Sequence, residues 1–474
     1  MTTSVESPSI GASLRMPKLP WLFAFYGLAL LAVVWAAASG EWSVAALAVT
    51  ASAAVAVAVR SPESLLAAWI VLSPWLSYAL RYPELKSVVT FDRLVIPAIV
   101  CGLLAGAIRR DGRLPRIHLG EVAALAFAVV ALASVALLSV EKGYAVRTAV
   151  DAFLLPAALL YAVRGGFDVE TGRSAVVLGA VLLGVVLPLP GIIEFLTGAD
   201  VLAYAGASIF RTGIVRPNGP FITDNSYAMV GAIVALFLVW SPRALGVRIR
   251  GVAHSLWTLA IAGAALAAAL PLFRTVLTTL IVALAVPWIV GLRVRAIARG
   301  ALVGVLFLVA ALPALLAVSG TAVFQDRIID PSSGFSRAAT YLAGADIVAD
   351  HPIVGVGLTN YHVYFLEKFG NAWYVEVETI GDEGAESYPH NNVLSVWAEL
   401  GILGLVPFVI AGVTMAGEAW RRRDVESIGL MVLYALPGLT LVTCYSADLN
   451  LTIAALVGVM LARHRTGPTS LPIP

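Results

Sequence analysis

The residues best suited to proton chemistry lie where a polar segment meets a long apolar segment. His390 and Asn391 stand at the head of the apolar stretch 391–415, which is long enough to predict a membrane-spanning helix. Free N–H groups at a helix start attract anions, and the helix dipole there disfavours a charged imidazolium. We therefore expect His390 to be a neutral ring that can accept a proton, although an interfacial or helix-capping role would also explain this residue.

Arginines beside apolar stretches are the residues best suited to bind an anion. Arg211 and Arg216 flank Thr-Gly-Ile-Val just before Asn218, and Arg274 heads the apolar stretch 274–292. An arginine inside a membrane costs roughly 2.5–3.5 kcal/mol on insertion scales, so such a residue persists where it pairs with a carboxylate or binds an anion. The planar guanidinium group matches phosphate oxygens especially well.

Nearby carboxylates offer an alternative explanation for these arginines. Asp200, Asp224 and Asp448 could each pair with one of them. Several arginines on the same side of the protein as long loops instead favour a shared anion site. Asp224-Asn225 is also expected to cap the helix that follows it.

Neither a metal ion nor another cofactor is expected. His351, His362 and His390 are separated by 11 and 28 residues, a spacing that matches no common zinc-ligand pattern. Cys101 and Cys444 lie in separate apolar stretches, as small core residues do. The sequence has no Walker loop and no basic tract typical of nucleic-acid binding.

The elements that must position these residues are membrane helices. The chain has 474 residues, of which 60% are hydrophobic and 13% are charged, whereas a soluble domain is about half apolar and a quarter charged. The composition predicts an all-α polytopic membrane protein with about 12–14 transmembrane helices. The apolar stretches lie near 21–39, 42–59, 63–80, 94–108, 119–140, 146–164, 174–196, 225–241, 254–270, 274–292, 300–318, 391–415, 427–444 and 447–463.

Basic residues predict which end of the helix bundle faces the cytoplasm. If the N-terminus is inside, 20 of the 31 Lys and Arg residues fall in inner loops and tails and 11 fall outside. The positive-inside rule therefore predicts a multi-pass membrane protein with an even number of spans, both termini inside and His390 at the outer face. The outer set is Arg81, Lys86, Arg93, Lys142, Arg147, Arg211, Arg216, Arg274, Arg327, Arg337 and Lys368.

Long outer segments divide the chain. Two of them, 197–224 and 319–390, are too long for simple connections, and the second is expected to carry structure of its own. Within it, Ser336 is expected to cap a helix from Arg337 to about Ala349, Pro352 to end that helix, and a second helix to run over 360–369. The expected parts are a cytoplasmic tail over 1–20, N-terminal transmembrane helices over 21–196, an arginine-containing outer loop over 197–224, central transmembrane helices over 225–318, a large outer loop over 319–390, C-terminal transmembrane helices over 391–463 and a cytoplasmic tail over 464–474.

Four segments between about 205 and 410 carry a resemblance to a known family. They are Arg211 to Asn225 with Arg-Pro-Asn-Gly-Pro-Phe, Arg274 at the head of a span, Arg337 to Gly357 with Asp-His-Pro-Ile-Val-Gly-Val-Gly, and His390 to Gly404 with Glu-Leu-Gly-Ile-Leu-Gly. In this order, with a large outer loop between the last two, they resemble the superfamily of O-antigen ligases and O-antigen polymerases. The chain departs from the family at Phe273, where a small polar residue often precedes the arginine.

The resemblance implies a GT-C-type membrane glycosyltransferase of lipopolysaccharide or cell-envelope polysaccharide biosynthesis. Such an enzyme moves a glycan from an undecaprenyl-diphosphate donor to a hydroxyl acceptor, without a metal ion. It is a protein of the cytoplasmic (inner) membrane whose active site faces the periplasm or exterior. The acceptor is lipid A-core for ligases and the next repeat unit for polymerases, and membrane lipids surround the protein. By this likeness, His390 is the catalytic base of an inverting displacement. The residues implied to bind the diphosphate are Arg211, Arg216, Arg274 and Arg337, and those implied to orient groups are Asn218 and Asn391.

Two other classes of function remain open. A transporter of an anionic lipid or glycan would place charged or helix-breaking residues near the bilayer midplane, commonly in repeated halves, and the sequence shows no internal repeat. A non-catalytic envelope scaffold or sensor would need no histidine beside arginines. Within the enzyme class the shared motifs leave ligase and polymerase open, and we prefer ligase.

Overall fold

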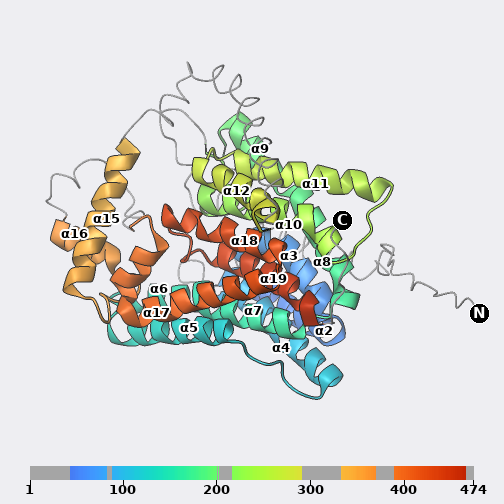
Figure 1. Ribbon diagram of the computed structural model, residues 1–474, viewed down its shortest axis with the longest axis horizontal. Helices are drawn as coiled ribbons and strands as arrows, with labels where there is room; N and C mark the ends of the chain where they lie inside the picture. The colour runs from blue at the N-terminus through green and yellow to red at the C-terminus, as the bar shows by residue number, and fades with distance from the viewer. Residues whose placement is uncertain are drawn as a thin grey trace, which may run out of the picture.

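Helices make up almost all of the computed structural model, which describes residues 43–82, 88–199, 201, 216–290, 332–369 and 389–465 (Figure 1). The strands β1 (Arg81–Tyr82) and β2 (Val89–Thr90) form only a two-residue antiparallel pair. The helices of the first half are α2 (Ser43–Arg60), α3 (Pro62–Ala79), α4 (Phe91–Asp111), α5 (Leu119–Leu137), α6 (Lys142–Thr148), the π-helix η1 (Ala149–Leu154), α7 (Leu155–Gly166), α8 (Val169–Val186) and α9 (Pro188–Thr197).

The second half of the chain is helical as well. It begins after the 218–221 turn and ends in a short 3₁₀ turn. Its helices are α10 (Asp224–Ala244), α11 (Val252–Ala269), α12 (Arg274–Val290), α15 (Ser332–Asp350), α16 (Tyr361–Phe369), α17 (Asn392–Arg421), α18 (Val425–Ala435), η3 (Pro437–Leu439), α19 (Ala447–Ala462) and η4 (Arg463–Arg465).

Seven of the described helical segments are long and apolar enough to cross a membrane. The protein is therefore an all-α protein with the architecture of a multi-pass membrane protein. Each predicted span that lies wholly or mostly within the described residues coincides with one helix or with two or three consecutive helices, whereas 21–39 and 300–318 lie outside them. The seven segments are Phe91–Asp111, Leu119–Leu137, Lys142–Gly166, Val169–Thr197, Asp224–Ala244, Val252–Ala269 and Asn392–Arg421.

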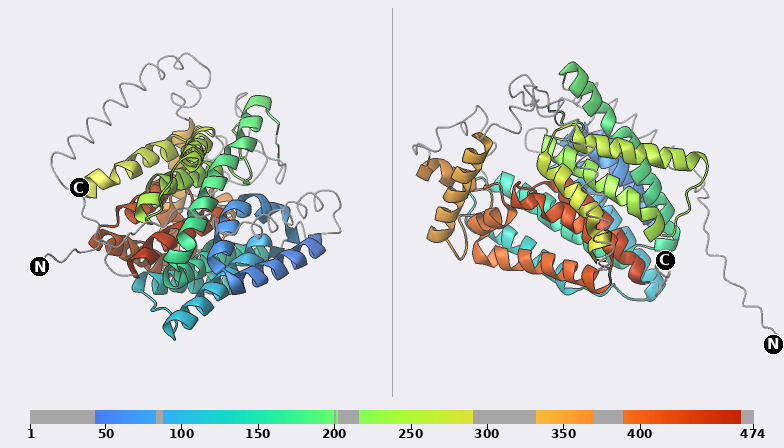
Figure 2. Two further views of the ribbon diagram at one scale, coloured as in Figure 1. Left: turned by 90° about the vertical axis from the view of Figure 1, so that its right-hand side faces the viewer. Right: turned by 45° about the horizontal axis from the view of Figure 1, so that its top comes forward.

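The core of the bundle is built around α10. Nearly every side chain from Tyr227 to Leu238 is buried, as expected for a helix that is apolar on all sides. Helices α8, α11, α18 and α19 pack against it. Along another edge of the bundle α5 and α17 lie side by side, and α15 and α16 stand at one end (Figures 1 and 2).

Helix α17 is bent at Gly401 because another segment presses against it. Gly401 has φ 63° and ψ −167°, and a Cβ there would lie 2.1 Å from the carbonyl oxygen of Ile353. The amide nitrogens of Val356 and Gly357 donate to the carbonyl oxygens of Ala398 and Glu399 at 3.0 and 2.9 Å. Two of the sequence motifs therefore pack directly against each other, Asp-His-Pro-Ile-Val-Gly-Val-Gly and Glu-Leu-Gly-Ile-Leu-Gly. Only glycine fits at position 401 between them.

The large outer segment carries two helices, as predicted, but the first begins earlier. Helix α15 already starts at Ser332, so the predicted cap at Ser336 is wrong. Serine is tolerated inside a helix, and Gly334 inside the helix costs only about 1 kcal/mol. The second helix, α16, runs as expected and buries Tyr361 and Phe365.

Candidate functional site

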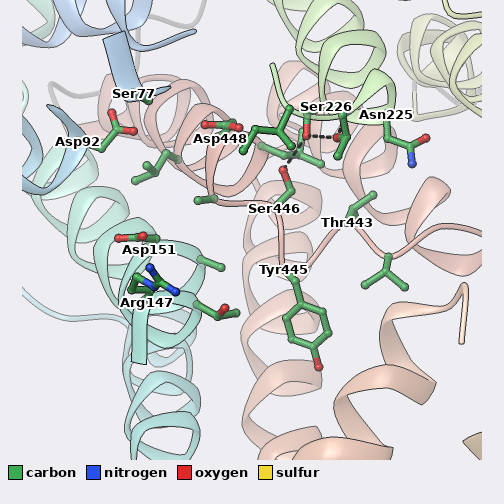
Figure 3. Close-up of a pocket in the computed structure, with 18 of the residues that line it drawn as sticks. Ser77, Asp92, Arg147, Asp151, Asn225, Ser226, Thr443, Tyr445, Ser446 and Asp448 are labelled. Carbon is green, nitrogen blue, oxygen red and sulfur yellow. Dashed lines mark hydrogen bonds between the residues drawn. The ribbon is translucent and has the colours of Figure 1, made fainter. Parts of the chain in front are cut away.

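A polar cavity of about 580 Å³ opens at the end of the bundle where α3 finishes and α4, α10, α17 and α19 begin (Figure 3). We call this end the cavity end. The polar and charged side chains that line it include Tyr78, Asp92, Arg93, Tyr144, Arg147, Asp151, Asn225, Ser226, His390, Tyr445, Ser446 and Asp448.

Several helices point their N-termini toward this cavity, and side chains cap them. Thr90 accepts a hydrogen bond from the amide of Arg93 at 3.3 Å, and Thr223 accepts one from the amide of Ser226 at 3.2 Å. The predicted cap at Asp224-Asn225 is therefore displaced by one residue, because the threonine hydroxyl takes the capping position. Each helix start contributes a partial positive charge at this end, of the kind that can attract an anion.

Two buried aspartates on one wall of the cavity are held by hydroxyl and indole groups. Asp92 accepts from Trp69 Nε1 at 2.8 Å and from Ser73 Oγ at 3.2 Å. Asp448 accepts from the hydroxyl of Tyr78. Because carboxylate oxygens have several lone-pair positions, such groups can accept further hydrogen bonds from ligand hydroxyls.

An ion pair fixes the wall formed by η1. Arg93 binds Asp151 through Nε and Nη2 at 2.7 and 2.6 Å, a two-point geometry. Pro156 has no N–H, so the carbonyl of Ala152 is free of its usual helical partner and instead accepts from Asn450 Nδ2 at 2.8 Å. The π-helical turn is thereby tied to α19, and Asp151 is brought to the cavity.

Arg147 is the arginine in this cavity that is free to meet an anion. Its guanidinium carbon lies 6.0 Å from the centroid of the Tyr144 ring. Within the described part of the chain no carboxylate lies within ion-pair distance of it. Figure 3 shows Arg147 beside Asp151, on the wall opposite Ser226 and Ser446, whose hydroxyls are 3.0 Å apart.

His390 lines the same cavity, at the start of α17. The hydroxyl of Tyr341 on α15 donates to the backbone carbonyl of His390 at 2.8 Å and to that of Leu439 at 3.1 Å. The position of the histidine is thus set by both α15 and the turn before α19. This placement agrees with the prediction of a histidine at a helix start.

Asn391 and Asn392 make different hydrogen bonds at this helix start. Asn391 caps α17, since its Oδ1 accepts from the amide of Leu394 at 3.0 Å, and it is absent from the cavity lining. Asn392 is buried, and its Oδ1 accepts from the amides of Thr443 and Cys444 at 2.8 and 3.1 Å. Asn392 therefore ties α17 to the loop that forms one side of the cavity.

Arg216 and Arg274 reach the cavity end but do not line the cavity. Arg216 lies 3.3 Å from Asp224 and 5.1 Å above the Phe273 ring, so the carboxylate pairing considered from the sequence occurs. Arg274 is exposed at the start of α12. The hydroxyl of the following residue, Thr275, lies 3.4 Å from Thr440 in the turn that also contacts α17.

The other predicted residues have different placements. Asn218 and Gly219 donate their amides to Glu194 Oε2 at 2.9 Å each, which holds the 218–221 turn against α9. Arg337 belongs to α15, but its side chain is outside the described structure. Arg211 lies outside the described residues.

The sequence signal that singled out Arg274 also applies to the arginines found in the cavity. Arg93 and Arg147 belong to the outer set of basic residues, and each stands at or beside the head of a predicted span. Neither lies in the motifs of the resemblance, so the sequence does not indicate either of them as a site residue. No group of three metal-binding side chains occurs among the described residues.

Neither a scan against models of protein families nor a search of curated proteins finds a match to this chain.

Proposed function

We propose that this protein is a membrane glycosyltransferase of the O-antigen ligase type, with a GT-C-type helical bundle. It would move a glycan from undecaprenyl diphosphate to a hydroxyl acceptor. One observation carries the proposal: His390 lines the same cavity as Arg147, an arginine without a carboxylate partner among the described residues. The residue likeness described above supports the same class.

In the proposed reaction the acceptor hydroxyl oxygen attacks the anomeric carbon of the donor. The bond from that carbon to the diphosphate oxygen breaks, and the diphosphate leaves with the electron pair. A ring nitrogen of His390 takes the hydroxyl proton, and the anomeric configuration inverts. General-base catalysis typically contributes 10²–10⁴-fold.

Arginines at the cavity end would stabilise the negative charge of the leaving diphosphate. Arg147 lines the cavity itself, and exposed Arg274 lies at the same end. Arg216 would act indirectly, because its contacts with Asp224 and with the Phe273 ring hold the segments next to the cavity together. Arg211 and Arg337 keep the role implied by the resemblance as part of the proposal.

The aspartate wall of the cavity suits the sugar acceptor rather than the diphosphate. Asp92 and Asp448 would repel phosphate oxygens but accept hydrogen bonds from hydroxyl groups. Ser226 and Ser446 on the neighbouring wall can donate or accept in the same way. A cavity with arginine on one wall and carboxylates on another can therefore hold an anionic donor beside a polyhydroxyl acceptor.

The location of the cavity favours an enzyme over a transporter. The cavity lies at helix ends, whereas transporter sites usually lie near the bilayer midplane between repeated halves. The excess of basic residues at the opposite end supports an orientation with the cavity at the outer face of the cytoplasmic membrane. Donor and acceptor would both be presented by lipid carriers there.

The test is glycan transfer by purified protein supplied with undecaprenyl-diphosphate-linked glycan in the presence of EDTA. One reaction contains lipid A-core and the other contains the donor alone. A single shifted product that requires lipid A-core supports a ligase, and a ladder from donor alone supports a polymerase.

His390→Ala is expected to reduce transfer about 10²–10⁴-fold. His254→Ala is the matched control, because His254 is exposed on α11 and does not line the cavity. Full transfer by the His390→Ala protein would overturn the proposed mechanism. Absence of transfer by the wild-type protein with either acceptor would favour the transport class.

A further inference from the structure

A second cavity, of about 300 Å³, lies at the opposite end of the bundle from His390. It is formed where α4, α7, α17 and α19 end and where α5 begins. Four arginines, two histidines and two carboxylates line it. Basic side chains therefore dominate this cavity, whereas three aspartates lie in the first cavity.

Two of its arginines are fixed by carboxylates. Arg164 Nη1 lies 3.2 Å from Glu121, and Arg164 Nη2 lies 2.6 Å from Glu418. Glu418 also lies 2.7 Å from Arg422. The side chains of Arg164 and Glu121 are only 5% and 1% exposed, so this ion pair is buried in the wall of the cavity.

The other two arginines, Arg113 and Arg116, are exposed. They lie in the connection between α4 and α5, and no carboxylate pairs with either of them among the described residues. Burial and the charge of Arg164 lower the pKa of His118, and Arg422 and Arg116 act in the same direction while Glu418 opposes them. Asp111 also lines this cavity, so the side near Arg113 and Arg116 has two positive charges against one negative charge.

Apolar side chains alternate with these arginines. Leu114, Ile117 and Leu119 are 57%, 52% and 63% exposed. Exposed apolar groups next to arginines are typical of the membrane–water interface, where lipid headgroups meet acyl chains. Basic pockets between membrane helices commonly bind phospholipid headgroups.

We propose that this cavity binds the phosphate group of an anionic phospholipid. Arg113 and Arg116 contact the phosphate, and Leu114 and Ile117 contact the acyl chains. The positive-inside rule assigns this end to the cytoplasmic leaflet. The site is independent of glycan transfer, which is proposed for the other end of the bundle.

The test uses the full chain purified in detergent and native mass spectrometry. Phosphatidylglycerol and phosphatidylcholine are titrated in separate experiments, and inorganic phosphate is titrated in a third. Wild-type protein is expected to retain phosphatidylglycerol in preference to phosphatidylcholine. Arg113→Ala/Arg116→Ala is expected to bind phosphatidylglycerol about tenfold more weakly, because two charge-assisted contacts are lost.

The matched control is Arg60→Ala/Arg250→Ala, which removes two exposed arginines at the same end but outside the cavity. It should bind as the wild type does. If the alanine pair does not fold, Arg113→Gln/Arg116→Gln serves instead, because glutamine keeps the length and polarity but not the charge. Equal binding of the two lipids, unchanged binding by the arginine variant, or equal loss in the control would each overturn the proposal. Inorganic phosphate that binds as tightly as the lipid would assign the cavity to free phosphate and overturn the lipid assignment.

Discussion

Replacing Arg147 by alanine is expected to remove most glycan transfer while leaving the fold intact. Arg147 lines the cavity that contains His390, and its described contact is with the ring of Tyr144. Because no described carboxylate pairs with it, the substitution leaves no carboxylate without its partner. The expected loss of folding stability is that of one cation–π contact, about 0.5–1 kcal/mol.

The effect on the reaction should be much larger. A charged donor aimed at charge that develops in a transition state is worth about 2.7–4 kcal/mol, or about 10²–10³-fold in rate. Arg93→Ala makes an instructive comparison, because it leaves Asp151 without its two-point partner. Both side chains are partly exposed, at 15% and 24%, so that variant should lose stability by about 1–3 kcal/mol.

The assay combines the initial rate of transfer at saturating donor with thermal unfolding in the same detergent. Lys142→Ala is the control for Arg147→Ala, since Lys142 is an exposed cation on the same helix and does not line the cavity. The expected result is a large rate loss at nearly constant unfolding temperature for Arg147→Ala alone. The reasoning is refuted if Arg147→Ala transfers glycan as fast as Lys142→Ala, or if its rate falls only as far as its folded fraction.

Two predictions concern stability. Gly401→Ala should destabilise the protein by at least about 1–3 kcal/mol because of the backbone conformation at this position, and the new Cβ would also clash with Ile353. Gly412→Ala is the control, since Gly412 lies in the same helix with open space around it, and this variant should be neutral or stabilising. Equal thermal unfolding of the two variants would contradict the prediction. Burial raises the pKa of Asp424, but the hydrogen bond with His464 and the charge of Arg463 more than offset it and hold that pKa below its ordinary value. The stabilisation from this carboxylate is therefore fully present above the unfolded pKa of about 3.9 and is lost as the pH falls through the lower folded pKa. The difference in unfolding free energy between wild type and Asp424→Asn should accordingly shrink below about pH 4, and a difference independent of pH would refute the assignment.

The helical architecture could be predicted from the sequence because hydropathy and chain breaks are local properties. Stretches such as 225–241 and 391–415 are apolar over a membrane's thickness, and each coincides with a helix. The end of α15 before Pro352 follows from local chemistry in the same way. The start of that helix could not be predicted in this way, because Ser332 and Ser336 both lie inside the helix and a serine by itself does not mark a helix start.

The local setting of His390 could also be predicted, since a histidine before a long apolar stretch must lie near a helix start. The cavity that His390 lines could not be predicted, because its lining comes from segments far apart in the chain. Tyr78 meets Asp448, and Ser226 meets Ser446. Such contacts depend on how the helices pack, and local patterns do not encode them.

The sequence by itself determined that this is a helical, multi-pass protein with a histidine at a helix start and arginines near span ends. Only the tertiary structure decided what several of the described arginines contact. Arg216 is turned to Asp224 and Phe273, Arg93 is neutralised by Asp151, and Arg147 faces the cavity. The physical reason is that a charge acts on what lies within a few ångströms, and packing of distant helices sets those distances.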